Sequence, residues 1–258
     1  MKRFLVALTA LDATNMNGQA QEAQPANASQ SATSRPSGPV QQRIAPGLAA
    51  LTDDVLFGDV WRRTELSPRD RSLVTISVLI ATGKPAQLGG HLGRALDNGL
   101  RPSEASGLLA HLAIYCGWPS AVSALDVYEQ VYRARNVDTA SLLPPSSPVR
   151  PSSDTTPIGA PKSELKLIAP KFVQLTSDVV FGDLWRRTDL TVRDRSLATV
   201  AALTAMGDDD QLDEYFRRAV DSGLTRAQLA ETLTHIAFYA GWPKATTALR
   251  ALTRALGQ

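Results

Sequence analysis

The stretch HLGRALDNGLRPSEASGLLAHLAIYCGWP, from His91 to Pro119, decides the fold because the chain contains it twice. It returns as YFRRAVDSGLTRAQLAETLTHIAFYAGWP, from Tyr215 to Pro243. The similarity extends outward from this stretch: residues 44–125 align with 168–249 without a gap, and 41 of these 82 positions are identical. A duplication of this length predicts two copies of one structural unit.

Each copy is predicted to be helical throughout. In the first copy, helix 67–83 has a capping serine, Ser67, and a proline at its first helical position, and its apolar residues are spaced to bury one stripe. In the second copy, Thr225 and Gln228 are spaced as a capping box. No run alternates apolar and polar residues as a strand does. The fold class is therefore all-α, and the helices expected in the first copy are 53–63, 67–83, 86–98, 103–116 and 120–133.

Composition divides the chain into five segments: a candidate signal peptide, a tether, a first repeat, a linker and a second repeat. The first has a basic start, a short apolar core and small residues near its end, which favours export to the periplasm over a cytoplasmic location. The tether is rich in Gln, Ala, Ser and Pro, a composition typical of disorder. The linker is rich in Pro and Ser, so we expect the repeats to pack in several relative positions. The boundaries are 1–20, 21–43, 44–135, 136–163 and 164–258.

Charge and cysteine content exclude several classes of protein. The 27 basic and 25 acidic residues nearly cancel, which argues against a nucleic-acid partner. The longest apolar run, near 73–81, is too short to span a membrane. The single cysteine, Cys116, excludes an intramolecular disulfide and a metal site built from thiolates of one chain.

Two of the three histidines, His111 and His235, occupy equivalent positions in the two copies. Each is either a buried residue that hydrogen-bonds to a neighbouring helix or a proton donor or acceptor near neutral pH. Glu231 precedes His235 by one helical turn, and we expect it to fix the tautomer of that histidine. In the first copy the equivalent residue is Gly107, so that partner is missing.

The third histidine, His91, is not duplicated, because its counterpart is Tyr215. Three glycines at positions 89, 90 and 93 flank His91, at a cost to helix stability. They provide either open space around the imidazole for a ligand or close packing of another helix.

Two further features are candidates for binding. The sequence Arg-Asp-Arg at 69–71 recurs at 193–195 near a predicted helix start. It is either an internal ion-pair network or an anchor for a substrate carboxylate. Trp118 and its counterpart Trp242 either pack over the Gly-Trp-Pro turn or contact a ligand.

Taken together, these motifs resemble the carboxymuconolactone decarboxylase family. The resemblance rests on RDRSLVTISVLIATG (69–83), HLGRALDNGL (91–100) and LLAHLAIYCGWPSA (108–121), and on LTRAQLAETLTHIAFYAGWPKA (224–245) in the second copy. It implies the all-helical unit shared with alkylhydroperoxidase D. It also implies self-association, plausibly as a trimer of tandem chains that resembles a hexamer.

The family contains two chemistries. One branch uses a Cys-x-x-Cys-x-x-x-His motif, but here the cysteine positions hold Lys84 and Gln87, and Asp208 and Gln211 in the second copy. A thiol relay, and with it a peroxiredoxin-type activity, is therefore disfavoured. The other branch decarboxylates a carboxylated muconolactone in aromatic compound catabolism without a cofactor.

The resemblance thus implies a cofactor-free carboxy-lyase that acts on a small carboxylated lactone or related acid, with a non-catalytic oligomeric scaffold as the alternative. The reaction needs a proton donor and a cation. We expect no cofactor and no metal, and Tyr215 suggests that the second copy has lost its donor. The residues assigned are His91, His111 and Arg71 as catalytic, Arg69, Tyr115 and Trp118 as substrate-binding, and Glu231, His235 and Arg195 as second-repeat candidates.

Overall fold

The computed structural model describes residues 35–142 and 163–257. The candidate signal peptide and most of the predicted tether and linker lie outside these ranges. The described residues form helices and turns without a strand, which confirms the all-α class. None of their helices is long and apolar enough to cross a bilayer.

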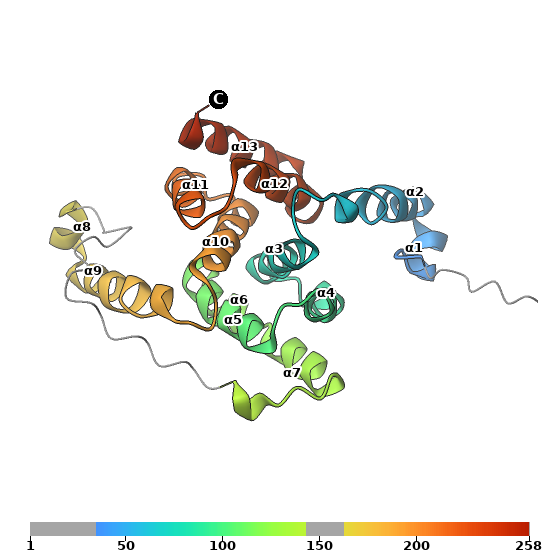
Figure 1. The fold of residues 1–258 in the computed structure, drawn as a ribbon, viewed down its shortest axis with the longest axis horizontal. Helices are drawn as coiled ribbons and strands as arrows, with labels where there is room; N and C mark the ends of the chain where they lie inside the picture. The colour runs from blue at the N-terminus through green and yellow to red at the C-terminus, as the bar shows by residue number, and fades with distance from the viewer. Residues whose placement is uncertain (1–34, 143–162, 258) are drawn as a thin grey trace, which may run out of the picture. The chain divides into compact units, whose positions relative to one another are not determined.

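The two repeats contain matching series of helices (Figure 1). The first series is α1 (Pro39–Ile44), α2 (Pro46–Ala50), a π-helical turn (Leu51–Leu56), a 3-10 turn (Val60–Arg62), α3 (Pro68–Ala81), α4 (Pro85–Asp97), α5 (Pro102–Cys116), α6 (Trp118–Val122), α7 (Leu125–Ala134) and a 3-10 turn (Thr139–Ser141). The second is α8 (Ser163–Ile168), α9 (Pro170–Leu175), a π-helical turn (Thr176–Phe181), a 3-10 turn (Leu184–Arg186), α10 (Val192–Met206), α11 (Leu212–Asp221), α12 (Arg226–Ala240) and α13 (Trp242–Leu256).

The predicted caps are present. The Ser67 hydroxyl accepts a hydrogen bond from the backbone N–H of Asp70, and Pro68 begins α3. Thr225 and Gln228 form the expected capping box at the start of α12. Such caps stabilise a helix by about 1 kcal/mol each. They fix where α3 and α12 begin, and so fix the register of the side chains that these helices carry.

The single helix predicted at 53–63 is wrong. A π-helical turn ends at Leu56, and a separate 3-10 turn begins at Val60. Between them the chain turns so tightly that a Cβ on Gly58 would overlap the backbone oxygen of Asp54. The charge pattern at the two ends gave no sign of this break, which re-aims the side chains that follow it.

The other helix boundaries also differ from prediction in places. The helix predicted at 120–133 is divided into α6 and α7, whereas its counterpart α13 is continuous. Helix α1 lies inside the segment predicted as a tether, and a 3-10 turn and the start of α8 lie inside the predicted linker.

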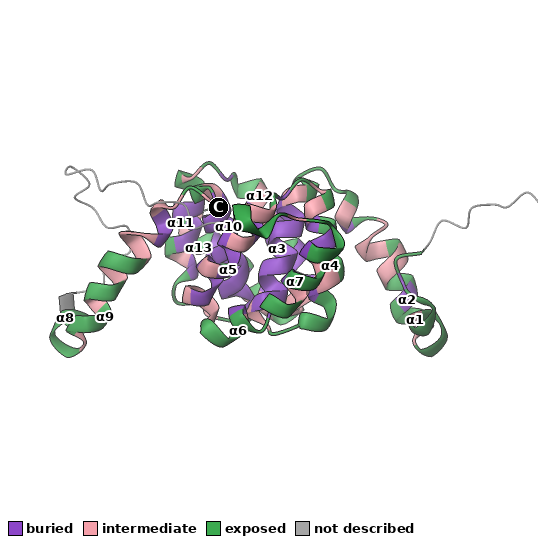
Figure 2. Ribbon diagram, turned by 90° about the horizontal axis from the view of Figure 1, so that it is seen from below, coloured by how far each residue is buried: buried purple, intermediate pink, exposed green. Residues whose placement is uncertain are grey.

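The expectation that the repeats pack in several relative positions is also wrong, because the described residues of both repeats belong to one compact unit. Helix α3 packs against α10, and each also packs against helices of the other repeat, α12 and α5 respectively. One apolar cluster contains core residues of both repeats. Figure 2 shows α3 and α10 as the most completely buried helices. Both helices are buried on every side rather than along the one stripe that the sequence predicts. The reason is that α12 of the second repeat covers a face of α3, and α5 of the first repeat covers a face of α10.

The repeated Arg-Asp-Arg sequence joins the repeats. Arg69 donates a hydrogen bond to Asp194 at 2.8 Å, and Arg193 donates to both oxygens of Asp70 at 3.0 and 2.8 Å. Both aspartates are almost completely buried. These two reciprocal pairs favour the ion-pair interpretation of this sequence over a free carboxylate anchor.

Candidate functional site

Aromatic and basic side chains of both repeats meet beside the middle of α4. We call this group the His91 cluster and define it as Phe57, Trp61, His91, Arg94, His235 and Tyr239. The His91 ring stacks beside Trp61 with centroids 6.1 Å apart and meets Tyr239 edge-on at 5.3 Å. The Trp61 indole N–H donates a hydrogen bond to the Tyr239 hydroxyl at 3.0 Å. Because α4 and α12 belong to different repeats, neither repeat alone contains this group.

The duplication creates a second such group with the roles of the repeats exchanged. We call it the Tyr215 cluster and define it as Phe181, Trp185, Tyr215, Arg218, His111 and Tyr115. The Trp185 indole N–H donates to the Tyr115 hydroxyl at 2.8 Å, which repeats the bond from Trp61 to Tyr239. Tyr215 takes the place of His91, and its hydroxyl lies 2.8 Å from that of Tyr115. The two clusters therefore share five equivalent residue types and differ at the sixth position, which holds an imidazole in one and a phenol in the other.

The duplicated histidines are fully buried and bonded to the central helices. Nε2 of His235 lies 2.8 Å from the Thr75 hydroxyl, and this hydroxyl donates its proton to the backbone oxygen of Arg71. Since the hydroxyl has one proton, it must accept from His235, which therefore carries its proton on Nε2. His111 and Thr199 repeat the arrangement. The predicted role of Glu231 in fixing this tautomer is wrong, because Thr75 fixes it.

His91 differs from the other two histidines in burial. Its side chain is half-buried whereas theirs are fully buried, and no hydrogen bond to either of its ring nitrogens is formed among the described residues; the Nδ1 atoms of all three histidines are buried and without a partner. Burial, and to a lesser degree the positive charge of Arg94, lower the pKa of His91 to about 4. The free imidazole is therefore neutral at pH 7, and it lies where a bound anion would raise its pKa again.

Arg94 is the cation of the His91 cluster that sequence reasoning missed. Its guanidinium lies 4.9 Å from the Phe57 ring centroid and 5.3 Å from that of Trp61, and its side chain is exposed. It makes no ion pair within the described parts of the chain. Its counterpart Arg218 is also stacked on rings but is only 6% exposed. The spacing of Arg94 from His91, three residues along one predicted helix, was a signal that could have identified it.

Arg71, the predicted catalytic cation, is completely buried. One of its terminal nitrogens donates to Glu231 at 2.8 Å and to the backbone oxygen of Arg63 at 2.8 Å. Arg63 holds the same carboxylate through two bonds of 3.0 Å. Glu231 thus neutralises Arg71 across the repeat boundary, and Arg94 is the cation left accessible at this cluster.

The second repeat neutralises Arg195 differently. Arg195 pairs with Asp189 of its own repeat, and a Cβ on Gly107, the counterpart of Glu231, would lie 2.6 Å from the Asp189 carboxylate. The glycine and the aspartate therefore fit one another, because the missing side chain provides the space that the carboxylate fills.

This arrangement predicts a rescue. Asp189→Ala should destabilise the protein by about 3–5 kcal/mol, because it leaves a buried guanidinium unpaired. Adding Gly107→Glu should recover a large part of the loss, because it copies the arrangement of Glu231 and Arg71. Urea unfolding of the two variants measures both effects. If the double variant were less stable than Asp189→Ala, a carboxylate at position 107 could not replace that of Asp189, and the prediction would be contradicted.

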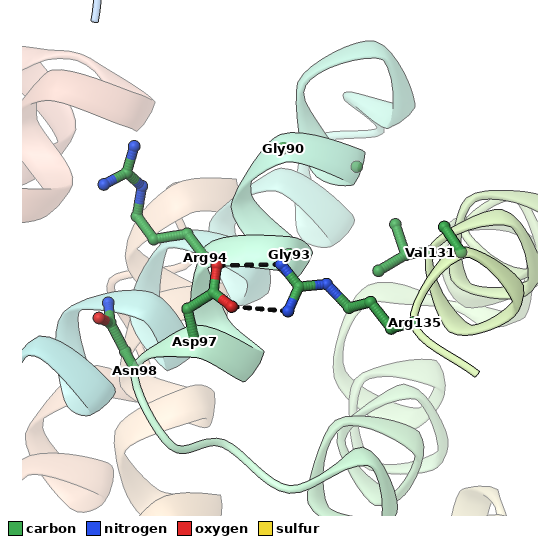
Figure 3. A pocket seen from close by; sticks show the side chains of 9 residues that line it. Gly90, Gly93, Arg94, Asp97, Asn98, Val131 and Arg135 are labelled. Carbon is green, nitrogen blue, oxygen red and sulfur yellow. Dashed lines mark hydrogen bonds and ion pairs between the residues drawn. The ribbon is translucent and has the colours of Figure 1, made fainter. Parts of the chain in front are cut away.

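The glycines beside His91 face α7 and not the imidazole. A Cβ on Gly93 would lie 3.2 Å from Arg135, and one on Gly89 would lie 3.6 Å from Val127. All three glycines and Arg94 line a cavity of about 480 Å³ between α4 and α7 that His91 does not line. Figure 3 shows Arg135 reaching across this cavity to Asp97. The glycines therefore border α7 and this cavity, and the predicted open space lies beside them without reaching the imidazole of His91.

The remaining predicted site residues lie apart or are already paired. Trp118 begins α6 and is 64% exposed. Arg69 is held by Asp194, and Tyr115 lies in the Tyr215 cluster rather than beside His91. Burial raises the pKa of the Cys116 thiol to about 12, so this cysteine is a thiol at neutral pH and a poor nucleophile.

The buried histidines predict a loss of stability in mild acid. Burial lowers the pKa of His235 to about 3 and that of His91 to about 4, and it lowers that of His111 as well. As the pH falls from about 6.5 to about 4, the unfolded chain binds protons that the folded chain does not, so stability decreases through this window by up to about 1.4 kcal/mol per pH unit for each histidine. Urea unfolding at pH 7 and pH 5 measures the slope, which His235→Gln should flatten. Equal stability at both pH values would contradict the prediction.

Comparison with known proteins agrees with the tandem arrangement. The profile of the carboxymuconolactone decarboxylase family matches residues 46–130 and again 170–254. The chain is 38% identical over 77 residues to a 4-carboxymuconolactone decarboxylase of Acinetobacter baylyi, a match that covers 30% of this chain and 58% of the relative. It is 34% identical over 85 residues to a nitrosuccinic acid decarboxylase of Metarhizium robertsii, covering 33% of this chain and 59% of the relative.

The alignments with these relatives thus span between half and two thirds of their length, about one repeat of this chain. The family profile, in contrast, covers more than half of this chain and falls on both repeats. The residue types that the two clusters share at equivalent positions are the structural counterpart of that double match. The chain therefore belongs to the carboxymuconolactone decarboxylase family.

Proposed function

We propose that this protein is a cofactor-free carboxy-lyase for a small carboxylated lactone or related acid, and that its active site is the His91 cluster. One observation carries the proposal: a half-buried imidazole lies beside an arginine that has no ion-pair partner in the described residues. The names of the two relatives support it, because each is a decarboxylase of a carboxylated compound.

The substrates in those names share a chemical feature. A lactone carbonyl and a nitro group both accept the electron pair that remains when a carboxylate leaves as carbon dioxide. The protein then has two tasks, which are to hold the anionic substrate and to return a proton to the resulting carbanion. No residue needs to form a covalent bond to the substrate.

Arg94 and His91 fit these two tasks. Arg94 offers an exposed guanidinium for a substrate carboxylate, and guanidinium–carboxylate pairs are strong and oriented. A carboxylate bound there offsets the charge of Arg94 and raises the pKa of His91 from about 4, so that binding favours the protonated donor. The rings of Trp61 and Tyr239 exclude water from one side of the imidazole.

The test is carbon dioxide release from 4-carboxymuconolactone and nitrosuccinic acid, with succinic acid as a control that lacks an electron-accepting group. We expect release from at least one of the first two and none from succinic acid. Failure with both would remove the support for a lyase and favour the non-catalytic scaffold.

We further propose that the chains assemble as a trimer. The helices before each repeat's core carry large apolar side chains that are exposed in the single chain: Val40, Ile44 and Leu48 in α1 and α2, and Leu167 and Ile168 in α8. Exposed apolar patches of this kind are typical of protein–protein contacts. Light scattering should give three times the mass of one chain, and a monomer would contradict the proposal.

A further inference from the structure

A cavity lies at the Tyr215 cluster. Its volume is about 330 Å³, within the range of small-molecule sites. Four aromatic rings line it: Tyr115, Tyr215, Phe181 and Phe172. The first three belong to the Tyr215 cluster, and Phe172 comes from α9. Both repeats form the wall, because Tyr115 belongs to the first repeat and the other three rings to the second.

The charged residues that line this cavity are both acidic. They are Asp208, which is half-buried, and Glu214, which is exposed at the start of α11. Within the described residues, no lysine or arginine lines it. Carboxylates combined with aromatic faces attract organic cations, the former by charge and the latter through the ring quadrupole.

The aligned repeats show that the equivalent positions of the first copy are not acidic. The counterparts of Asp208 and Glu214 are Lys84 and Gly90, and the counterpart of Tyr215 is His91. The formal charge at the two positions changes from +1 in the first copy to −2 in the second. An anion suited to Arg94 and His91 is therefore repelled where the second copy carries its acidic pair.

Two cations of the described residues lie near this cavity without lining it, Lys244 and Arg218. Lys244 donates to the backbone oxygen of Ala205, and its side chain would lie 3.9 Å from a Cβ on Gly207, the residue before Asp208.

Arg218 is 6% exposed, does not line the cavity, and rests over the Trp185 ring with 4.4 Å between the guanidinium carbon and the ring centroid. The carboxylates of Glu214 and Asp221 both act on its charge. The carboxylates of Asp208 and Glu214 line the cavity, whereas Arg218 and Lys244 do not, so the surface that a ligand would touch favours a cation.

We propose that the cavity beside Tyr215 binds a small organic cation that has an ammonium group on an apolar body. The ammonium group lies toward Asp208 and Glu214, and the apolar body lies against Phe172, Phe181 and the tyrosine rings. This inference does not depend on the lyase activity proposed for the His91 cluster.

The experiment is isothermal titration calorimetry of the full chain at low ionic strength, where charge effects are least screened. The probes are benzyltrimethylammonium and phenylacetate, which have similar apolar bodies and opposite charge. The test variant Asp208→Asn/Glu214→Gln removes both carboxylates with little change of shape. The matched control Asp126→Asn/Glu129→Gln removes two exposed carboxylates from α7.

We expect the wild type to bind benzyltrimethylammonium about tenfold more tightly than phenylacetate, and the test variant to lose about tenfold in affinity for the cation. The control should bind the cation as the wild type does. No cation binding, equal binding of both probes, or equal losses in test and control variants would overturn the inference. Failure of the lyase proposal appears separately, in the carbon dioxide assay.

Discussion

His91→Ala should lower kcat/KM for carbon dioxide release by about 10²–10⁴-fold, the usual contribution of a positioned proton donor. His91 is the half-buried histidine of its cluster, whereas His235 is fully buried and bonded to Thr75. The measurement is steady-state kinetics on whichever substrate of the panel the wild type decarboxylates.

The matched control is Arg133→Gln, a change to a 79%-exposed side chain on α7 that pairs only with Glu129. It should leave the kinetics unchanged. Urea unfolding of His91→Ala should show a folded protein, so that lost activity is assigned to chemistry. A folded His91→Ala enzyme with full activity would remove His91 from the reaction.

Glu231→Ala should destabilise the protein by about 3–5 kcal/mol, because it leaves the buried Arg71 without its carboxylate. The side chain of Arg71 is 0% exposed and that of Glu231 is 5% exposed, so water cannot replace the lost pair. The variant also removes the two bonds that Arg63 donates to the same carboxylate, so that Arg63 keeps its pair with Glu65. Urea unfolding at pH 7 measures the change.

Glu129→Ala is the control, because it removes a carboxylate from an exposed helical pair with Arg133. Such pairs contribute about 0–1 kcal/mol. Equal losses of unfolding free energy in the two variants would show that the buried pair between the repeats stabilises the protein no more than an exposed helical pair does.

The fold was largely predictable because duplication, caps and apolar spacing are local or internal to the sequence. Ser67 and the capping box at Thr225 identify helix starts without any knowledge of packing. The break at Gly58 was not predictable, since it depends on how closely the chain approaches Asp54. Burial of α3 on all sides was missed for a related reason: its second face is covered by the other repeat.

The candidate site was predictable only in part. The difference between His91 and Tyr215 is visible in the aligned copies, and it directs attention to the right helix. The partners of His91 were not visible, because Trp61 comes from an earlier turn and Tyr239 from the other repeat. Arg71 was chosen over Arg94 because sequence does not show which arginine already has a carboxylate.

The central claim is that the His91 cluster binds and decarboxylates a carboxylated substrate. It is tested most directly by a crystal structure of the protein with a saturated carboxylated lactone, whose carboxylate cannot leave. We predict the ligand carboxylate on Arg94 and the ligand ring within hydrogen-bonding distance of His91. An analogue bound away from Arg94, with His91 still enclosed by Trp61 and Tyr239 and touching no ligand atom, would contradict the claim.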